Sequence, residues 1–92
     1  MKHVLKYQIT NDINQAGIKK ATLKLPYYSD IVSVEVQRGI LCIWVESEVG
    51  TTEFVDTDFI LIETGDEFPD NTKFVGTVHH TGWVWHLYEM TR

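Results

Sequence analysis

The stretch that most constrains this chain is an alternation of apolar and polar residues on both sides of one short turn, over residues 31–46. A period of two is typical of a β-strand that buries one face. Arg38 and Gly39 form the turn, and a two-residue hairpin of the favoured type needs positive φ at both positions. Glycine adopts positive φ without strain and arginine tolerates it poorly. We therefore predict a β-hairpin centred on this turn.

A two-residue loop also fixes the cross-strand neighbours of the hairpin. It predicts one continuous core face made of three apolar pairs, which are Val36 with Leu41, Val34 with Ile43, and Val32 with Val45. The opposite face then carries Ser33, Glu35, Ile40, Cys42 and Trp44. We expect this tryptophan to be covered by another part of the fold or by a second subunit, or to be available to a ligand.

Five further segments have the apolar pattern of strands, namely residues 3–9, 20–25, 53–63, 73–80 and 83–90. The run 59–62 is apolar on both faces, so its strand is predicted to be central or to lie under a loop. The polar stretch 11–17 is predicted to be a loop. Seven strands without a convincing helix predict an all-β fold, a small antiparallel β-sandwich or partly open barrel. The length predicts one domain, residues 1–92.

The charge balance restricts the partners of the chain. Thirteen acidic residues against eight basic ones give a net charge of −5, which argues against a binder of long nucleic acids. Most of the basic residues nevertheless fall early in the chain, and a local basic patch suits a small anionic ligand. The single cysteine excludes an internal disulfide, and the sequence lacks a signal peptide and an apolar run long enough for a membrane span. We therefore expect a cytoplasmic protein without membrane contact.

The stretch richest in chemically versatile side chains is 78–89, with three histidines, two tryptophans and a tyrosine. A two-residue loop at Thr81-Gly82 places His79 and His86 on one face as diagonal neighbours, whereas a three-residue loop separates them. Zinc sites need three or four converging ligands, and no third ligand is evident, so we predict no metal site. Imidazoles packed beside indoles are the favoured interpretation of this stretch.

No pattern in the chain identifies a catalytic residue. Asp56 and Asp58 share one face of a strand, and without calcium-loop spacing they are interpreted as solvated edge charges. Cys42 stands between aliphatic neighbours and is interpreted as a packed apolar side chain. The sequence also lacks a nucleophile elbow, a phosphate loop and a Cys-x-x-Cys pair. We therefore predict no enzymatic activity and no cofactor, with an enzyme or metal protein based on the histidine pair as the remaining alternative.

Aromatic stacking is the functional hypothesis that the composition favours, because exposed rings can receive a base or a partner's side chain. Alternation cannot bury Trp44 and Val45 on the same side of a strand, so at least one aromatic face needs a cover other than the main core. A second copy is the commonest cover, and we expect a homo-oligomer. The candidate ligand- or partner-binding residues are Trp44, Trp83, Trp85, His79, His86 and Lys6.

Five segments in order along the chain carry a resemblance to a known family. They are Lys6-Tyr7, residues 22–26, the hairpin 31–44, Gly76-Thr77 and residues 82–89. On these segments the chain resembles a family of small phage-encoded proteins of unknown function. It departs from the family at a Gly-Thr-Gly segment, which reads Glu63-Thr64-Gly65 here. The resemblance implies a phage origin and expression in the host bacterial cytoplasm, and it supplies no activity.

Together these observations lead us to expect a small phage accessory protein that acts by binding. Its partner would be a bacterial host protein, as for an inhibitor of host defence, or a small anionic ligand, as for a sponge of a signalling nucleotide. A homo-oligomeric structural or virion-associated protein is the main alternative.

Overall fold

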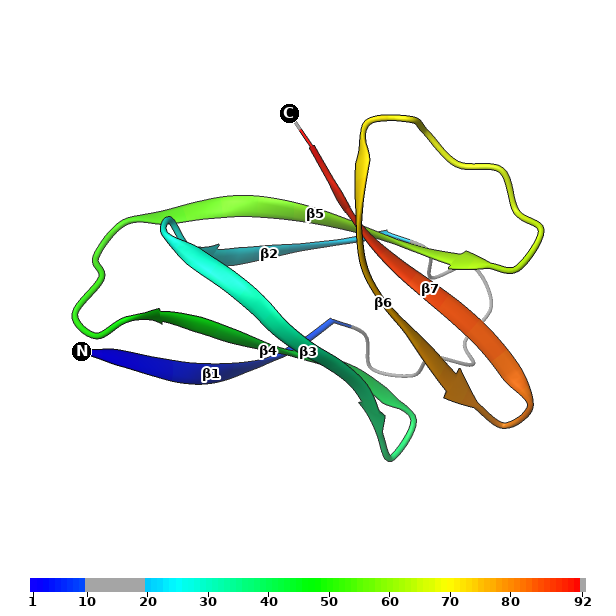
Figure 1. Ribbon diagram of the computed structural model, residues 1–92, viewed down its shortest axis with the longest axis horizontal. Coiled ribbons are helices and arrows are strands. Elements are labelled where there is room, and N and C mark those ends of the chain that lie inside the picture. The colour runs from blue at the N-terminus through cyan, green and yellow to red at the C-terminus, as the bar shows by residue number, and fades with distance from the viewer. Residues whose placement is uncertain (10–19, 92) are drawn as a thin grey trace.

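The structure is a computed structural model that describes residues 1–9 and 20–91, so the predicted loop 11–17 lies outside the described residues. Seven strands and no helix make up the described part of the chain, as the sequence predicts. The strands are β1 (Lys2–Gln8), β2 (Lys20–Pro26), β3 (Ser29–Gln37), β4 (Ile40–Glu48), β5 (Phe54–Glu63), β6 (Thr72–His80) and β7 (Trp83–Met90) (Figure 1).

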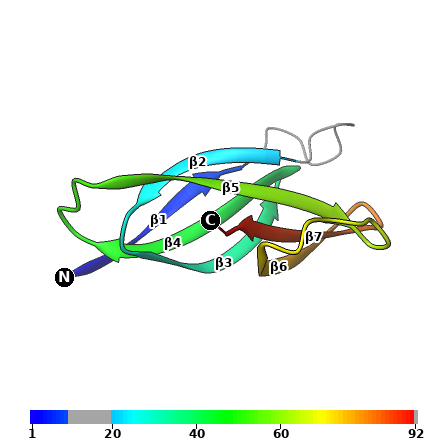
Figure 2. The same ribbon diagram turned by 90° about the horizontal axis from the view of Figure 1, so that it is seen from above.

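The strands form two antiparallel sheets. A three-stranded sheet has the order β1-β4-β3, and a four-stranded sheet has the order β2-β5-β7-β6. In Figure 2, β2 and β5 lie on one side and β1, β4 and β3 on the other. Because no hydrogen-bonded ladder joins the two sheets in the described residues, the fold is a sandwich and not a closed barrel.

The core lies between the sheets and receives every second side chain of the inner strands. Its buried members are Leu25, Leu41, Ile43, Val45, Phe59, Leu61, Val78 and Leu87. The strand β5 is central in its sheet, between β2 and β7, and its apolar run 59–62 is buried on both faces with exposures of 1–7%. This confirms the prediction of a central strand. Phe59 and Leu61 belong to the core, and Ile60 and Ile62 lie opposite Tyr88 and His86 on the other face.

The central hairpin has the predicted two-residue turn, with φ of 55° at Arg38 and 79° at Gly39. The pairs of Val34 with Ile43 and of Val36 with Leu41 are confirmed. The predicted pair of Val32 with Val45 is wrong. A bulge at Val32 shifts the register, so that Ile31 pairs with Val45 and Val32 is 52% exposed. Both residues are apolar, so the alternation alone does not reveal the bulge.

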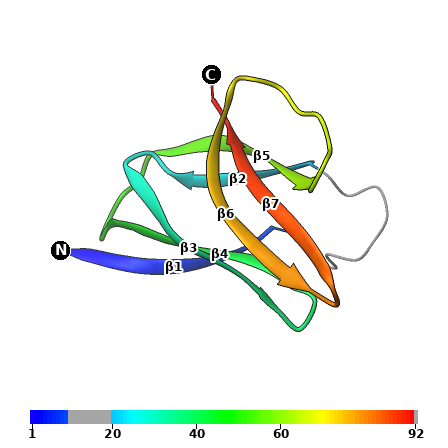
Figure 3. The same ribbon diagram turned by 45° about the vertical axis from the view of Figure 1, so that its right-hand side comes forward.

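A second bulge interrupts β6 between Phe74 and Gly76, and β6 lies beside β3 at one side of the sandwich (Figure 3). Here a Cβ atom built on Gly76 would overlap the side chain of Val34, so only glycine permits this approach. Bulges bend a strand and end its regular pairing. The two edge strands therefore lie side by side while they remain parts of separate sheets.

Candidate functional site

The residues singled out from the sequence do not form one site. Lys6 and Trp44 are cross-strand neighbours on the outer face of the three-stranded sheet. His79 and His86 lie on the outer face of the four-stranded sheet. These two outer faces are on opposite sides of the sandwich, so one small ligand cannot contact both pairs.

The two tryptophans of the terminal hairpin occupy a third region. Trp85 packs against the core, and its Nε1 is buried without a hydrogen-bond partner among the described residues. Trp83 points to the same side of β7 but stands beside the turn, where 57% of it is exposed. Of the three tryptophans, Trp85 therefore has a packing role, and Trp83 and Trp44 retain accessible ring surface.

Lys6 lies on the edge strand β1 and reaches across the outer face of the three-stranded sheet. Its Nζ lies 5.8 Å from the ring centroid of Trp44 and donates a 2.6 Å hydrogen bond to Oε1 of Gln37. Lys6 pairs with Trp44, and Gln37 pairs with Ile40. The hydrogen bond from β1 to β3 therefore passes over β4 at Cys42, midway between Trp44 and Ile40. This crossing explains why Cys42 is only 2% exposed although it points away from the core.

A shallow hollow lies on this face beside the turn of the central hairpin. Its lining residues are Lys6, Gln8, Gln37, Arg38, Ile40 and Cys42. Two of them are cations and none is acidic, in a chain whose net charge is −5. Glu35 faces Cys42 across the strands but does not line the hollow. The hollow is therefore a local exception to the acidic character of the chain.

The cations at the other end of the same sheet are paired. Nζ of Lys2 lies 3.2 Å from Oε1 of Glu46, and the amino group of Met1 lies 3.3 Å from Oε2 of Glu48. The hydrogen bond to Glu46, and then its charge, raise the pKa of Lys2 above its ordinary value. By contrast, neither Lys6 nor Arg38 has a carboxylate partner within the described ranges 1–9 and 20–91.

The terminal hairpin lies on the opposite side of the molecule. Its loop at Thr81-Gly82 has two residues, not three, because His80 pairs with Trp83. His86 is held by two threonines on this face. Its Nε2 lies 2.9 Å from Oγ1 of Thr64, and its Nδ1 lies 2.9 Å from Oγ1 of Thr77. Hydroxyl groups both donate and accept, so this arrangement satisfies the ring in either tautomer.

A histidine with both nitrogens engaged offers no free lone pair to a metal ion. The described part of the chain also contains no group of three or more His, Cys, Asp or Glu side chains arranged to hold a metal. His79 is exposed, and its side chain forms no hydrogen bond with the residues that the structure describes. The geometry gives the histidine pair a structural role at His86 and an open surface position at His79.

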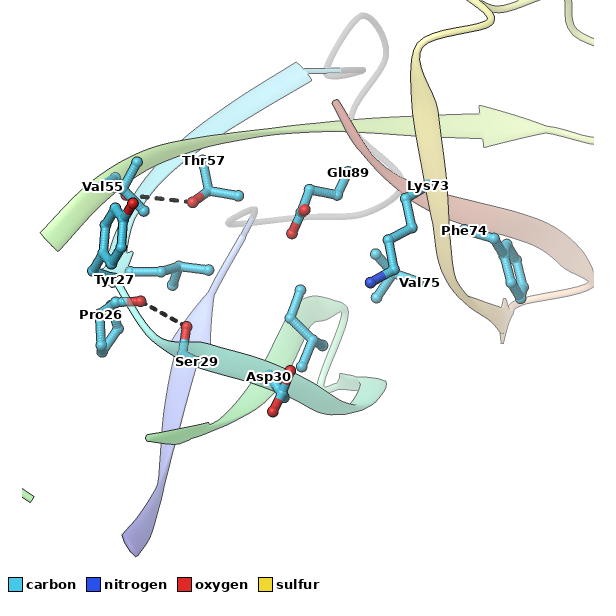
Figure 4. A pocket seen from close by; sticks show the side chains of 12 residues that line it. Pro26, Tyr27, Ser29, Asp30, Val55, Thr57, Lys73, Phe74, Val75 and Glu89 are labelled. Atoms are coloured by element: carbon cyan, nitrogen blue, oxygen red, sulfur yellow. Dashed lines mark hydrogen bonds between the residues drawn. The ribbon is translucent and has the colours of Figure 1, made fainter. Parts of the chain in front are cut away.

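A third feature is a cavity of about 250 Å³ at the end of the sandwich where β2 passes into β3 (Figure 4). No sequence pattern predicts this cavity, because it arises from the spacing of two sheets. Nor does any pattern predict Gln37 as the partner of Lys6 or Thr77 as that of His86. The register of the two hairpins could have identified Thr77, which lies directly opposite His86.

The fold and these features define a small all-β sandwich domain with a cationic hollow on one outer face and an end cavity. The chain belongs to the family described as Domain of unknown function (DUF7352), whose model matches residues 1–92. Comparison with curated proteins gave no match, and comparison with solved structures gave none either. Within the described residues, no helix has the length and apolar character needed to cross a lipid bilayer.

Proposed function

We propose that this domain is a phage accessory protein that acts in the host bacterial cytoplasm by binding a small anionic ligand with an aromatic ring, of the nucleotide class. The observation that carries the proposal is the hollow beside Trp44, which is lined by Lys6 and Arg38 and by no acidic residue. Sequestering such a ligand would make the protein a sponge for a nucleotide signal. The resemblance to phage proteins supports the biological setting.

The anionic part of the ligand is assigned to the two cations. A phosphate group forms stronger hydrogen bonds with lysine and arginine than a neutral acceptor does. The present acceptor of Lys6 is the neutral amide oxygen of Gln37, which a phosphate oxygen can replace. Because both cations are on one face and lack carboxylate partners in the described ranges, a ligand need not break an ion pair in order to bind.

The ring of the ligand is assigned to Trp44. Stacking of a base on an aromatic side chain contributes about 1–3 kcal/mol and tolerates every base. Trp44 is partly exposed, and its other cross-strand neighbour is the small side chain of Ser33. A small neighbour leaves one side of the indole accessible to a planar group.

Thermal unfolding with a panel of cyclic and linear nucleotides tests this proposal. A binding nucleotide should raise the free energy of unfolding by RT ln(1 + [L]/Kd), which is about 2.7 kcal/mol at a hundredfold excess over Kd. Lys6→Met should weaken binding about tenfold, the effect of removing one charged hydrogen bond. Lys2→Met is the matched control on the same strand and face, and it should bind as the original protein does. Absence of a shift with every nucleotide contradicts the proposal.

A homo-oligomeric structural protein is the second candidate, and an aromatic cluster on the four-stranded sheet favours it. Tyr88 lies 4.5 Å from Phe68 and 5.4 Å from Phe74 between ring centroids. Phe68 is 39% exposed and Phe74 is 54% exposed, so a second copy could cover both rings. Sedimentation velocity at micromolar concentration separates the two candidate functions. A monomer that binds a nucleotide would exclude the homo-oligomeric structural protein.

A further inference from the structure

The end cavity is distinct from the cationic hollow and lies between the sheets. The strands β2, β3, β5, β6 and β7 and the β2–β3 connection all contribute to its wall. Its volume of about 250 Å³ is below the range of about 300–1,000 Å³ for drug-sized ligands. Any ligand that fits it must therefore be small.

Two opposite charges line this space, and no ion pair joins them. Lys73 on β6 and Glu89 on β7 are cross-strand neighbours, and both side chains point toward the cavity in Figure 4. Neither side chain forms an ion pair or a hydrogen bond with another described residue. Glu89 is partly buried, and a carboxylate that loses water without gaining a partner destabilises the fold. A bound ligand can supply the missing partners.

Two other polar side chains in the wall are hydrogen-bonded to backbone carbonyls. Oγ1 of Thr57 donates to the carbonyl of Val55 at 3.3 Å, and Oγ of Ser29 donates to the carbonyl of Pro26 at 2.8 Å (Figure 4). Asp30 lies near Lys2, and its charge contributes to the raised pKa of that lysine. Lys73 and Glu89 are therefore the pair of opposite charges that the wall offers to a ligand, beside the exposed Tyr27 and Asp30.

The wall also contains aliphatic side chains. Leu25, Ile31, Val55 and Val75 contribute aliphatic surface from both sheets. A ligand with an aliphatic group gains about 25 cal/mol for each square ångström of apolar surface that it removes from water. The wall therefore combines two opposite charges with a smaller area of aliphatic surface.

We propose that this cavity binds a small zwitterion with an apolar side chain, of the α-amino acid class. The ammonium group of the ligand donates hydrogen bonds to Glu89, and its carboxylate accepts hydrogen bonds from Lys73. The aliphatic walls receive the side chain. This site is independent of the nucleotide-binding face, since Lys6 and Arg38 do not line it.

Titration of the ¹⁵N-labelled protein with L-leucine, followed by amide chemical shifts, tests this proposal. L-Leucine should produce saturable shifts at Thr57, Val75 and Glu89 at concentrations up to about 10 mM. Isoamylamine lacks the carboxylate and 4-methylpentanoate lacks the ammonium, and each should bind about tenfold more weakly than L-leucine. Absence of saturable shifts at the cavity overturns the proposal, and equal binding of either analogue overturns the zwitterion assignment.

Two variants locate the site. Glu89→Gln and Lys73→Met should each weaken the binding of L-leucine about tenfold, because each removes one charged hydrogen-bond partner. Glu67→Gln changes an exposed carboxylate outside the cavity and should bind as the original protein does. Lys73 is exposed, so its variant tests the proposal even when Glu89→Gln does not fold. Unchanged binding in Lys73→Met overturns the assignment.

Discussion

The outer faces of the two sheets both carry basic side chains, but they satisfy these groups differently. On the four-stranded sheet, both ring nitrogens of His86 lie 2.9 Å from threonine hydroxyls. On the three-stranded sheet, Lys6 has one neutral acceptor, and Arg38 has no ion pair in the described part of the chain. A polar group whose hydrogen bonds are complete stabilises the fold, whereas an unmatched charge remains available to a ligand.

Segments that carry the family resemblance contribute to the outer faces of both sheets. Thr64, Thr77 and His86 come from three separate segments, and the structure joins them by hydrogen bonds. The chain departs from the family at Glu63, but it keeps the threonine of that segment, Thr64. Gly76, beside Thr77, permits the close approach of β6 to Val34 on β3. The resemblance also covers Lys6 and the hairpin 31–44, so it includes residues of the hollow as well as the scaffold around His86.

The largest expected effect would test the four-stranded face. His86→Ala removes the common partner of two hydroxyl groups and exposes the neighbouring Ile62, so it should lower the free energy of unfolding by about 1–2 kcal/mol. Urea unfolding measures this change. His79→Ala is the matched control on the same face and should change stability by less than about 0.5 kcal/mol. Equal effects of the two substitutions would contradict the structural role of His86.

An intermediate effect would test the three-stranded face. Lys6→Ala removes the bridge that crosses Cys42, and loss of one hydrogen bond of about 1 kcal/mol corresponds to a roughly fivefold faster opening. The rate at which a thiol reagent labels Cys42 under native conditions should rise by this factor. Lys2→Ala leaves the bridge intact and should label at the original rate. An unchanged rate in Lys6→Ala would show that other side chains cover the thiol.

The smallest effect concerns the paired cations. Lys2→Met should change stability only slightly, because exposed ion pairs are screened by solvent and salt. The pair with Glu46 raises the pKa of Lys2, so its contribution is present below the ordinary value of 10.5 and is lost as pH rises through the raised pKa. The difference in urea unfolding between Lys2→Met and the original protein should therefore shrink at alkaline pH. A difference that grows there would contradict the assignment.

The sequence predicts the strands and most of their faces, because apolar alternation reports which side of a strand is buried. It places Cys42 and Trp44 opposite the valine face of the central hairpin, as observed. It does not reveal the bulge at Val32, since Ile31 and Val32 are both apolar and the packing of β3 decides between them. The partner Thr64 reaches His86 from a loop, and the end cavity depends on how two sheets meet. Neither this contact nor the cavity produces a pattern in the local sequence.

The strand order has a consequence for the synthesis of the chain. The strand β1 pairs with β4, and β2 pairs with β5, so both wait for partners that are translated much later. At about 5–20 residues per second, this delay lasts several seconds. Both are edge strands in the finished sheets, and their outward positions include Lys2, Lys6, Lys20 and Lys24. Lysines on strand edges oppose pairing with other chains. The early lysines therefore protect the nascent chain while its first strands are unpaired.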